Sequence, residues 1–169
     1  EESTAWPKVT GDPEKDSLGF SLKWNMGWMH DFTEYMKLDP LFRKNAHYMM
    51  TFSMEYAYSE DYILVLSHDE VVHLKCSMLN KMPGEGLDKF RNLKVAYAFM
   101  AGHPGKKLLF MGQEFAQLRE WSEERELDWY LLAEEPHQHI QNWVQDLLHL
   151  YRDQKALYEL DTQPSGFQW

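Results

Sequence analysis

Cysteine and long apolar runs are nearly absent from this 169-residue sequence. The single cysteine, Cys76, excludes an internal disulfide, and this favours a reducing compartment. No apolar run approaches the roughly 20 residues that are needed to cross a bilayer, and no secretory signal peptide is visible. We therefore expect a cytoplasmic protein without a membrane partner.

Positive charge is also scarce. Lysine and arginine number 17 against 27 aspartates and glutamates, so the formal net charge is -10. Because nucleic acids and anionic membranes bind clustered basic side chains, this balance argues against both partners and favours a neutral, hydroxyl-rich ligand. The 44% hydrophobic share indicates one globular unit, and no repeat or low-complexity linker divides residues 1–169.

Strands and helices alternate in the pattern of apolar residues. Residues 62–66 are continuously apolar, which is typical of a strand covered on both faces in a parallel sheet. Apolar residues recur at helical spacing over residues 87–101, and glycines and proline at 102–105 end that helix. A second short strand is predicted at residues 107–111, and Pro136 can open a last amphipathic helix. The predicted order is strand, helix, strand, helix.

The residues before this unit have weaker patterns. Residues 20–24 favour a further strand, and residues 41–57 are rich in methionine and aromatic residues and have helical potential. The predicted fold class is α/β. Repeated βα units with buried parallel strands form either a closed barrel or an open doubly wound sheet, and periodicity does not separate the two.

Polar residues follow each of the two clear strands directly. Ser67, His68, Asp69 and Glu70 come after the first strand, and residues 112–115 (GQEF) come after the second. In a (β/α) barrel the carboxyl ends of the strands form the face that carries the active site, so these side chains would converge there. The alternative is that the two carboxylates merely terminate a strand.

A metal site and a serine nucleophile are both disfavoured at this position. His68 and His73 are five residues apart, so on a helix they would point roughly 140° away from each other. Ser67 and His68 are neighbours that a strand would direct to opposite faces. Indole rings pack well on sugars, but Trp143 lies on an apolar helix stripe, which leaves Trp6 as the better candidate for a ligand contact.

An ordered series of segments resembles the branching enzymes of the α-amylase-type glycoside hydrolases. Residues 1–4 (EEST) resemble the segment that ends the fifth barrel strand, and residues 67–73 (SHDEVVH) resemble the segment after the seventh. Further segments of this kind are 23–31 (KWNMGWMHD), 81–84 (KMPG), 103–112 (HPGKKLLFMG) and 127–129 (LDW). Together they span almost the whole chain.

The resemblance implies a partial (β/α)8 TIM barrel that runs from about the end of strand 5 through helix 8. Residues 1–169 would then be the C-terminal half of the catalytic barrel, without its N-terminal half and without the following β-sandwich. It also implies that Glu1 is the general acid/base, that Asp69 stabilises the transition state and that His68 binds sugar hydroxyls. Leu74 and Leu118 stand where the family often has glycine, so they could alter a loop near the groove.

The implied activity is cleavage of α-1,4-glucan chains and their transfer to a glucose O6, which forms the α-1,6 branches of glycogen. Two carboxylates suit such a retaining mechanism, in which Glu1 needs a raised pKa to remain protonated. No cofactor or metal is implied. The family's nucleophile lies in a segment with Arg two residues before Asp, which this sequence lacks, since Arg152-Asp153 falls on a predicted helix surface. We therefore expect this chain to be inactive by itself and to self-associate through its unpaired strand edges.

Two other readings remain open. Another α-amylase-family enzyme, such as a maltooligosyltrehalose hydrolase or a debranching enzyme, would share the fold and the carboxylates, although the segments 81–84 and 103–107 favour branching. The chain could instead be a non-catalytic glucan-binding fragment. Glucan binding without turnover would favour that reading.

Overall fold

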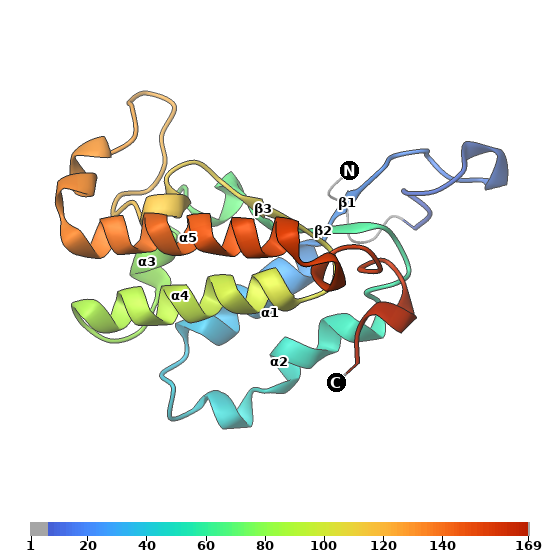
Figure 1. Ribbon diagram of the computed structural model, residues 1–169, viewed down its shortest axis with the longest axis horizontal. Coiled ribbons are helices and arrows are strands. Elements are labelled where there is room, and N and C mark those ends of the chain that lie inside the picture. Colours follow the sequence, from blue (N-terminus) through green and yellow to red (C-terminus); the bar gives the residue numbers. More distant parts are fainter. Residues whose placement is uncertain (1–6, 169) are drawn as a thin grey trace.

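A computed structural model describes residues 7–168 of the protein, in which three parallel strands form one sheet (Figure 1). The strands are β1 (Lys23–Trp24), β2 (Tyr62–Leu66) and β3 (Lys106–Leu109), and they pair in chain order. Parallel pairing of all three predicted strands is therefore confirmed. The first is shorter than predicted, because Phe20 only forms an isolated bridge with Thr10.

The middle strand, β2, lies at the centre of the core. Leu64, Val65 and Leu66 are completely buried, as the continuous apolar run predicted. The turn into β3 passes so close to β2 that a side chain at Gly105 would approach the Tyr62 carbonyl oxygen to 3.2 Å, and Gly105 has a positive φ of 108°. Glycine is thus required there both by space and by backbone conformation.

Helices α4 (Leu87–Gly102) and α5 (Glu135–Asp153) lie side by side at the front of the molecule in the view of Figure 1. Both were predicted, and the order strand, helix, strand, helix is confirmed. The short α3 (Met78–Lys81) lies between β2 and α4. Trp143 of α5 is half-buried, and its indole N–H donates to the Lys94 carbonyl of α4, so it joins the two helices.

A further helix, α1 (Met26–Lys37), was missed by the sequence analysis. The Asn25 side chain caps it by accepting a hydrogen bond from the Trp28 N–H at 2.9 Å. The Trp28 and Phe32 rings stack with their centroids 4.6 Å apart. Its buried residues, Trp28, Met29, Phe32, Thr33 and Met36, recur at helical spacing, and that signal was available in the sequence.

Residues 41–57, which have helical potential in the sequence, form separate short helical turns. The segment contains only the short turns η2 (Arg43–Asn45), α2 (Tyr48–Thr51) and η3 (Phe52–Glu55). Large apolar side chains there, including Leu41, Phe42, Tyr48 and Phe52, are exposed instead of forming one buried stripe. The remaining 3-10 turns are η1 (Pro13–Lys15), η4 (His68–Glu70), η5 (Gln113–Phe115), η6 (Trp129–Ala133), η7 (Lys155–Leu157) and η8 (Pro164–Gly166). None of the helices in residues 7–168 has the length and apolar character needed to span a membrane.

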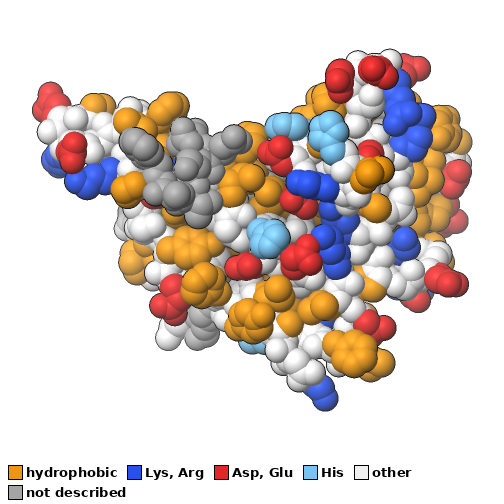
Figure 2. Space-filling model, turned by 180° about the vertical axis from the view of Figure 1, so that it is seen from behind, with side chains coloured by type: hydrophobic (Ala, Val, Ile, Leu, Met, Phe, Trp, Pro, Cys, Tyr) orange, Lys and Arg blue, Asp and Glu red, His pale blue; other side chains and the backbone are white. Residues whose placement is uncertain are grey.

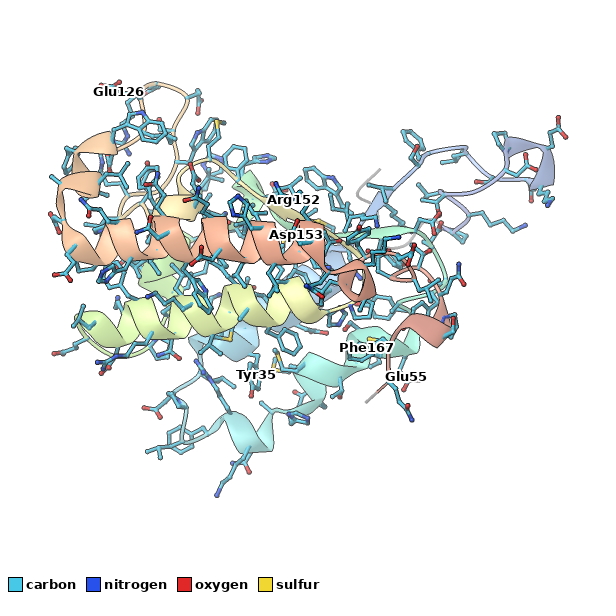
Figure 3. The ribbon with its side chains drawn as sticks, viewed as in Figure 1. Tyr35, Glu55, Glu126, Arg152, Asp153 and Phe167 are labelled. Carbon is cyan, nitrogen blue, oxygen red and sulfur yellow. The ribbon has the colours of Figure 1, made fainter. Side chains whose placement is uncertain are left out.

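His103 fastens the end of α4 to the segment around η3. Its ring Nδ1 lies 2.9 Å from the Pro104 carbonyl oxygen, which can only accept, so Nδ1 carries the proton. Nε2 then accepts from the Ser53 hydroxyl at 2.9 Å. The ring of Phe167, near the C-terminal end, stacks on the same imidazole at 6.4 Å (Figure 3). The pKa of His103 is lowered from 6.5 to about 4, mainly because the ring is buried; the hydrogen bond to the Pro104 carbonyl opposes this effect, and the nearby Lys107 charge adds to it.

Because the folded chain holds His103 neutral, its stability should fall as the pH decreases from about 6.5 towards 4. The unfolded chain binds a proton in that window and the folded chain does not, and a depression of this size corresponds to a loss on the order of 3 kcal/mol. Urea denaturation across this range measures the effect. We expect His103→Gln to be less stable at neutral pH and to have a flatter pH dependence. His47→Gln, at an exposed position, is the control, and an unchanged slope in His103→Gln would contradict the assignment.

Candidate functional site

His68 and Asp69 follow β2 directly, in the 3-10 turn η4. The Ser67 hydroxyl caps this turn: its oxygen accepts from the Asp69 backbone N–H at 3.3 Å, and the hydroxyl donates to the Asp69 carboxylate at 3.2 Å. His68 Nε2 lies 3.4 Å from the other carboxylate oxygen. The side chains of His68 and Asp69 are 48% and 36% exposed. They form a polar pair at the carboxyl end of the central strand that a ligand in solution can reach.

Glu70, the third residue of the turn, is buried and has a different environment. Its carboxylate lies 3.4 Å from the ammonium of Lys81 in α3 and 3.9 Å from that of Lys75. Burial lowers the pKa of Lys81, and the neighbouring Glu70 carboxylate opposes this effect. Glu70 therefore fixes the turn to α3, whereas Asp69 remains accessible.

The residues after β3 meet the end of β2. Gln113 is buried, and its side-chain amide donates to the Leu66 carbonyl at 3.0 Å; the same oxygen accepts from the Phe110 N–H at 3.1 Å. Gly112 precedes Gln113 with a φ of 88°, and a side chain there would meet the Gln117 side chain at 3.1 Å. The structure thus places Gln113 at the edge of the sheet that carries Asp69, as predicted. Its side-chain amide there joins the turn after β3 to the end of β2.

Glu114 is directed to a different region. It lines an apolar groove of about 570 Å³ between β3, α4 and α5, together with Tyr97, Val144 and Leu148. Burial and the Glu114 charge both raise the pKa of Tyr97. The structure therefore does not bring Glu114 together with His68 and Asp69.

The other predicted site residues have different positions. Glu1 and Trp6 lie outside the described residues. Arg152 and Asp153 form an exposed ion pair at the end of α5, as expected for a helix surface (Figure 3). Leu74 is 95% exposed and Leu118 is also exposed, and both lie in loops that follow strands.

An open cavity of about 560 Å³ adjoins η4 on its Glu70 side. Figure 2 shows histidine, acidic and basic side chains gathered on the face opposite to that of Figure 1. The charged and imidazole side chains that line the cavity are His30, Glu34, Lys37, Glu70, Lys75 and Lys81. Within residues 7–168, no three His, Cys, Asp or Glu side chains gather in a way that could hold a metal ion.

Three residues that support the site were not found from the sequence. The Phe110 ring lies 5.8 Å from the His68 ring and packs edge-on against Trp121 at 5.1 Å. The Trp121 backbone N–H donates to the Val71 carbonyl directly after η4. The side-chain carboxylate of the preceding Glu120 accepts from two backbone N–H groups of the loop that follows Val71. These contacts join residues far apart in the chain, so no local pattern could have indicated them.

Comparison with known proteins identifies relatives that align with the chain over its whole length. It is 66% identical over 169 residues to a protein of Butyrivibrio fibrisolvens named 1,4-alpha-glucan branching enzyme GlgB. It is 56% identical over 169 residues to a protein of the same name from Nitrobacter hamburgensis. The chain spans 26% and 24% of the length of these curated relatives. No family model matches it. The resemblance to branching enzymes indicated by the motifs is thus confirmed over the whole chain.

Replacing Glu70 should destabilise the fold, because it leaves the buried Lys81 ammonium without its carboxylate. Removing one partner of a buried ion pair typically costs about 3–5 kcal/mol, so we expect Glu70→Gln to lower the free energy of unfolding by about that amount in urea denaturation. The double variant Glu70→Gln/Lys81→Met should recover much of the loss. Glu85→Gln, at an exposed position, is the control. A Glu70→Gln variant as stable as the original chain would show that the pair does not hold the turn.

Proposed function

We propose that this chain is a segment of a 1,4-α-glucan branching enzyme, which cleaves α-1,4-linked glucan chains and transfers them to a glucose O6. The observation that carries the proposal is identity of 66% and 56% to two such enzymes over all 169 residues. The acidic net charge of -10 suits a neutral glucan better than nucleic acid or an anionic membrane as partner. We assign the protein to glycogen synthesis in the cytoplasm, without a cofactor.

In this proposal the three parallel strands belong to a (β/α)8 barrel, and residues 1–169 are the C-terminal half of its catalytic domain. The observed sheet supports this assignment, because β1, β2 and β3 follow one another in chain order with α1 after the first and α4 after the second. Active sites of such barrels lie at the carboxyl ends of the strands. Asp69 occupies that position on the central strand.

Asp69 is proposed to stabilise the positive charge that develops on the sugar in the transition state. Its carboxylate is partly exposed and is oriented by the Ser67 hydroxyl, so a charge is available at a fixed place. His68, beside it, would bind sugar hydroxyls. Glu1 would protonate the leaving oxygen, and Trp6 would contact a glucose ring; both of these roles rest on the sequence alone. The nucleophile that forms the covalent glucosyl intermediate would come from another segment of the longer protein.

Chain transfer on amylose tests this function in the longer protein that contains the segment. We expect new α-1,6 linkages with little released reducing sugar, since a glucose O6 instead of water intercepts the intermediate. Asp69→Asn should lower turnover by several orders of magnitude without unfolding the protein, because it removes the charge aimed at the transition state. Glu1→Gln should be similarly severe, and activated substrates should partly rescue its first step.

Asp146→Asn, an exposed carboxylate on α5, is the matched control for Asp69. Released sugar without new branches would indicate a hydrolase of the α-amylase family. Glucan binding without any turnover would indicate a binding protein, and near-normal turnover of Asp69→Asn would refute the role of that residue.

The 169-residue chain by itself should neither branch nor hydrolyse glucan and should self-associate. Within the described residues β3 pairs only with β2, so its outer edge is free, and the apolar groove beside it exposes Met111 and Leu148. Unpaired edges and apolar surfaces recruit further chains. Light scattering after size exclusion measures the mass, and prolonged incubation with amylose measures activity. A stable monomer would contradict the first expectation, and branch formation by the pure chain would contradict the second.

A further inference from the structure

The loop that follows η4 has an unfavourable backbone conformation. His73, Leu74 and Cys76 all have positive φ angles, of 54°, 69° and 67°. Residues with a Cβ atom rarely adopt this left-handed region, because the side chain approaches the backbone too closely. The Leu74 side chain is 95% exposed, so its burial does not compensate for the strain. Contacts from elsewhere must hold residues 71–76 in this shape.

The main such contact is the carboxylate of Glu120. One oxygen accepts from the Leu74 N–H at 3.1 Å, and the other accepts from the Cys76 N–H at 2.7 Å. These two backbone hydrogen bonds, that of Cys76 first, lower the pKa of the Glu120 carboxyl. Between the two bonds, the Lys75 carbonyl accepts from the buried Lys81 ammonium at 2.5 Å. The Glu120 carboxylate thus forms hydrogen bonds with two of the three strained residues at once.

The same segment is connected to the site residues by two routes. The backbone N–H of Trp121, next to Glu120, donates to the Val71 carbonyl at 3.0 Å, and the Val71 backbone N–H donates to the His68 carbonyl at 2.9 Å. The Trp121 ring also packs on Phe110, whose ring contacts that of His68. The turn that carries Asp69 is therefore held at its end by residues 120–121 and beneath its histidine by an aromatic pair.

We propose that Glu120 is a positioning residue for the glucan-transfer reaction. Its two backbone hydrogen bonds hold residues 71–76 in their strained conformation and so fix the turn that presents His68 and Asp69. The carboxylate suits this part because each of its two oxygens accepts one backbone N–H group. A glutamine at this position has the same size but offers only one oxygen and turns an NH2 group towards a donor. This inference rests on the proposed function, because it assigns Glu120 a part in that reaction.

The test uses the longer protein and compares Glu120→Gln with the original enzyme in the amylose branching assay. A misplaced Asp69 carboxylate slows the chemical step, so we expect kcat to fall by about 10- to 100-fold, and the displaced His68 should raise KM by a smaller factor. Hydrogen exchange at the Leu74 and Cys76 amides should accelerate in the same variant. Glu126→Gln is the matched control, because Glu126 is an exposed glutamate on the same loop (Figure 3) and should leave both readouts unchanged.

The variant Leu74→Gly tests whether Glu120 acts by holding the strained loop. Glycine adopts a positive φ without steric strain, so a loop with glycine at position 74 depends less on the hydrogen bonds to Glu120 to keep its conformation. We expect Leu74→Gly alone to retain normal kcat and Glu120→Gln/Leu74→Gly to regain most of the lost kcat. A normal kcat in Glu120→Gln, or a loss that Leu74→Gly does not restore, would overturn the inference. Absence of branching in the original longer protein would instead refute the proposed function.

Discussion

Parallel pairing on both sides of β2 is the constraint on which the rest of the molecule depends. Because the strands run in one direction, their carboxyl ends meet at a single edge, and the turns that follow β2 and β3 must lie next to each other. The Leu66 carbonyl makes this explicit, since it accepts hydrogen bonds from both Phe110 and Gln113. A buried strand with helices packed around it gives these turns a rigid base.

Carboxylates at that edge have distinct structural environments. Asp69 is accessible and lies beside a histidine, Glu70 is buried against Lys81, and Glu120 binds backbone N–H groups. Their surroundings separate the carboxylate that is exposed to solvent from the carboxylates that hold the turn and the loop in place. Functional sites need such supporting contacts, because a reactive group that can move loses its orientation. Strain in residues 71–76 is consistent with a loop whose shape is set by its surroundings instead of by its own preference.

The parts of the fold that the sequence predicted are those with a local apolar signal. The continuous run in β2 and the helical spacing in α4 and α5 indicated buried elements, and the structure confirms them. Residues 41–57 have the composition of a helix without a continuous buried stripe, so their helical potential produces only short turns. At the candidate site, the turn with His68 and Asp69 was predictable because it follows a strand. The Glu120 contacts were not, because 46 residues separate it from Leu74 and a glutamate in an acidic chain resembles a solvated surface residue.

The most direct test of this account is a crystal structure of the longer protein with a bound maltooligosaccharide. We predict that a glucose unit lies over the carboxyl end of β2, with its hydroxyl groups within hydrogen-bond distance of His68 and Asp69. The loop of residues 71–76 should keep its positive φ angles and its two bonds to Glu120. A glucan bound only at another surface, with Asp69 in contact with water alone, would contradict the assignment of this edge as the site of transfer.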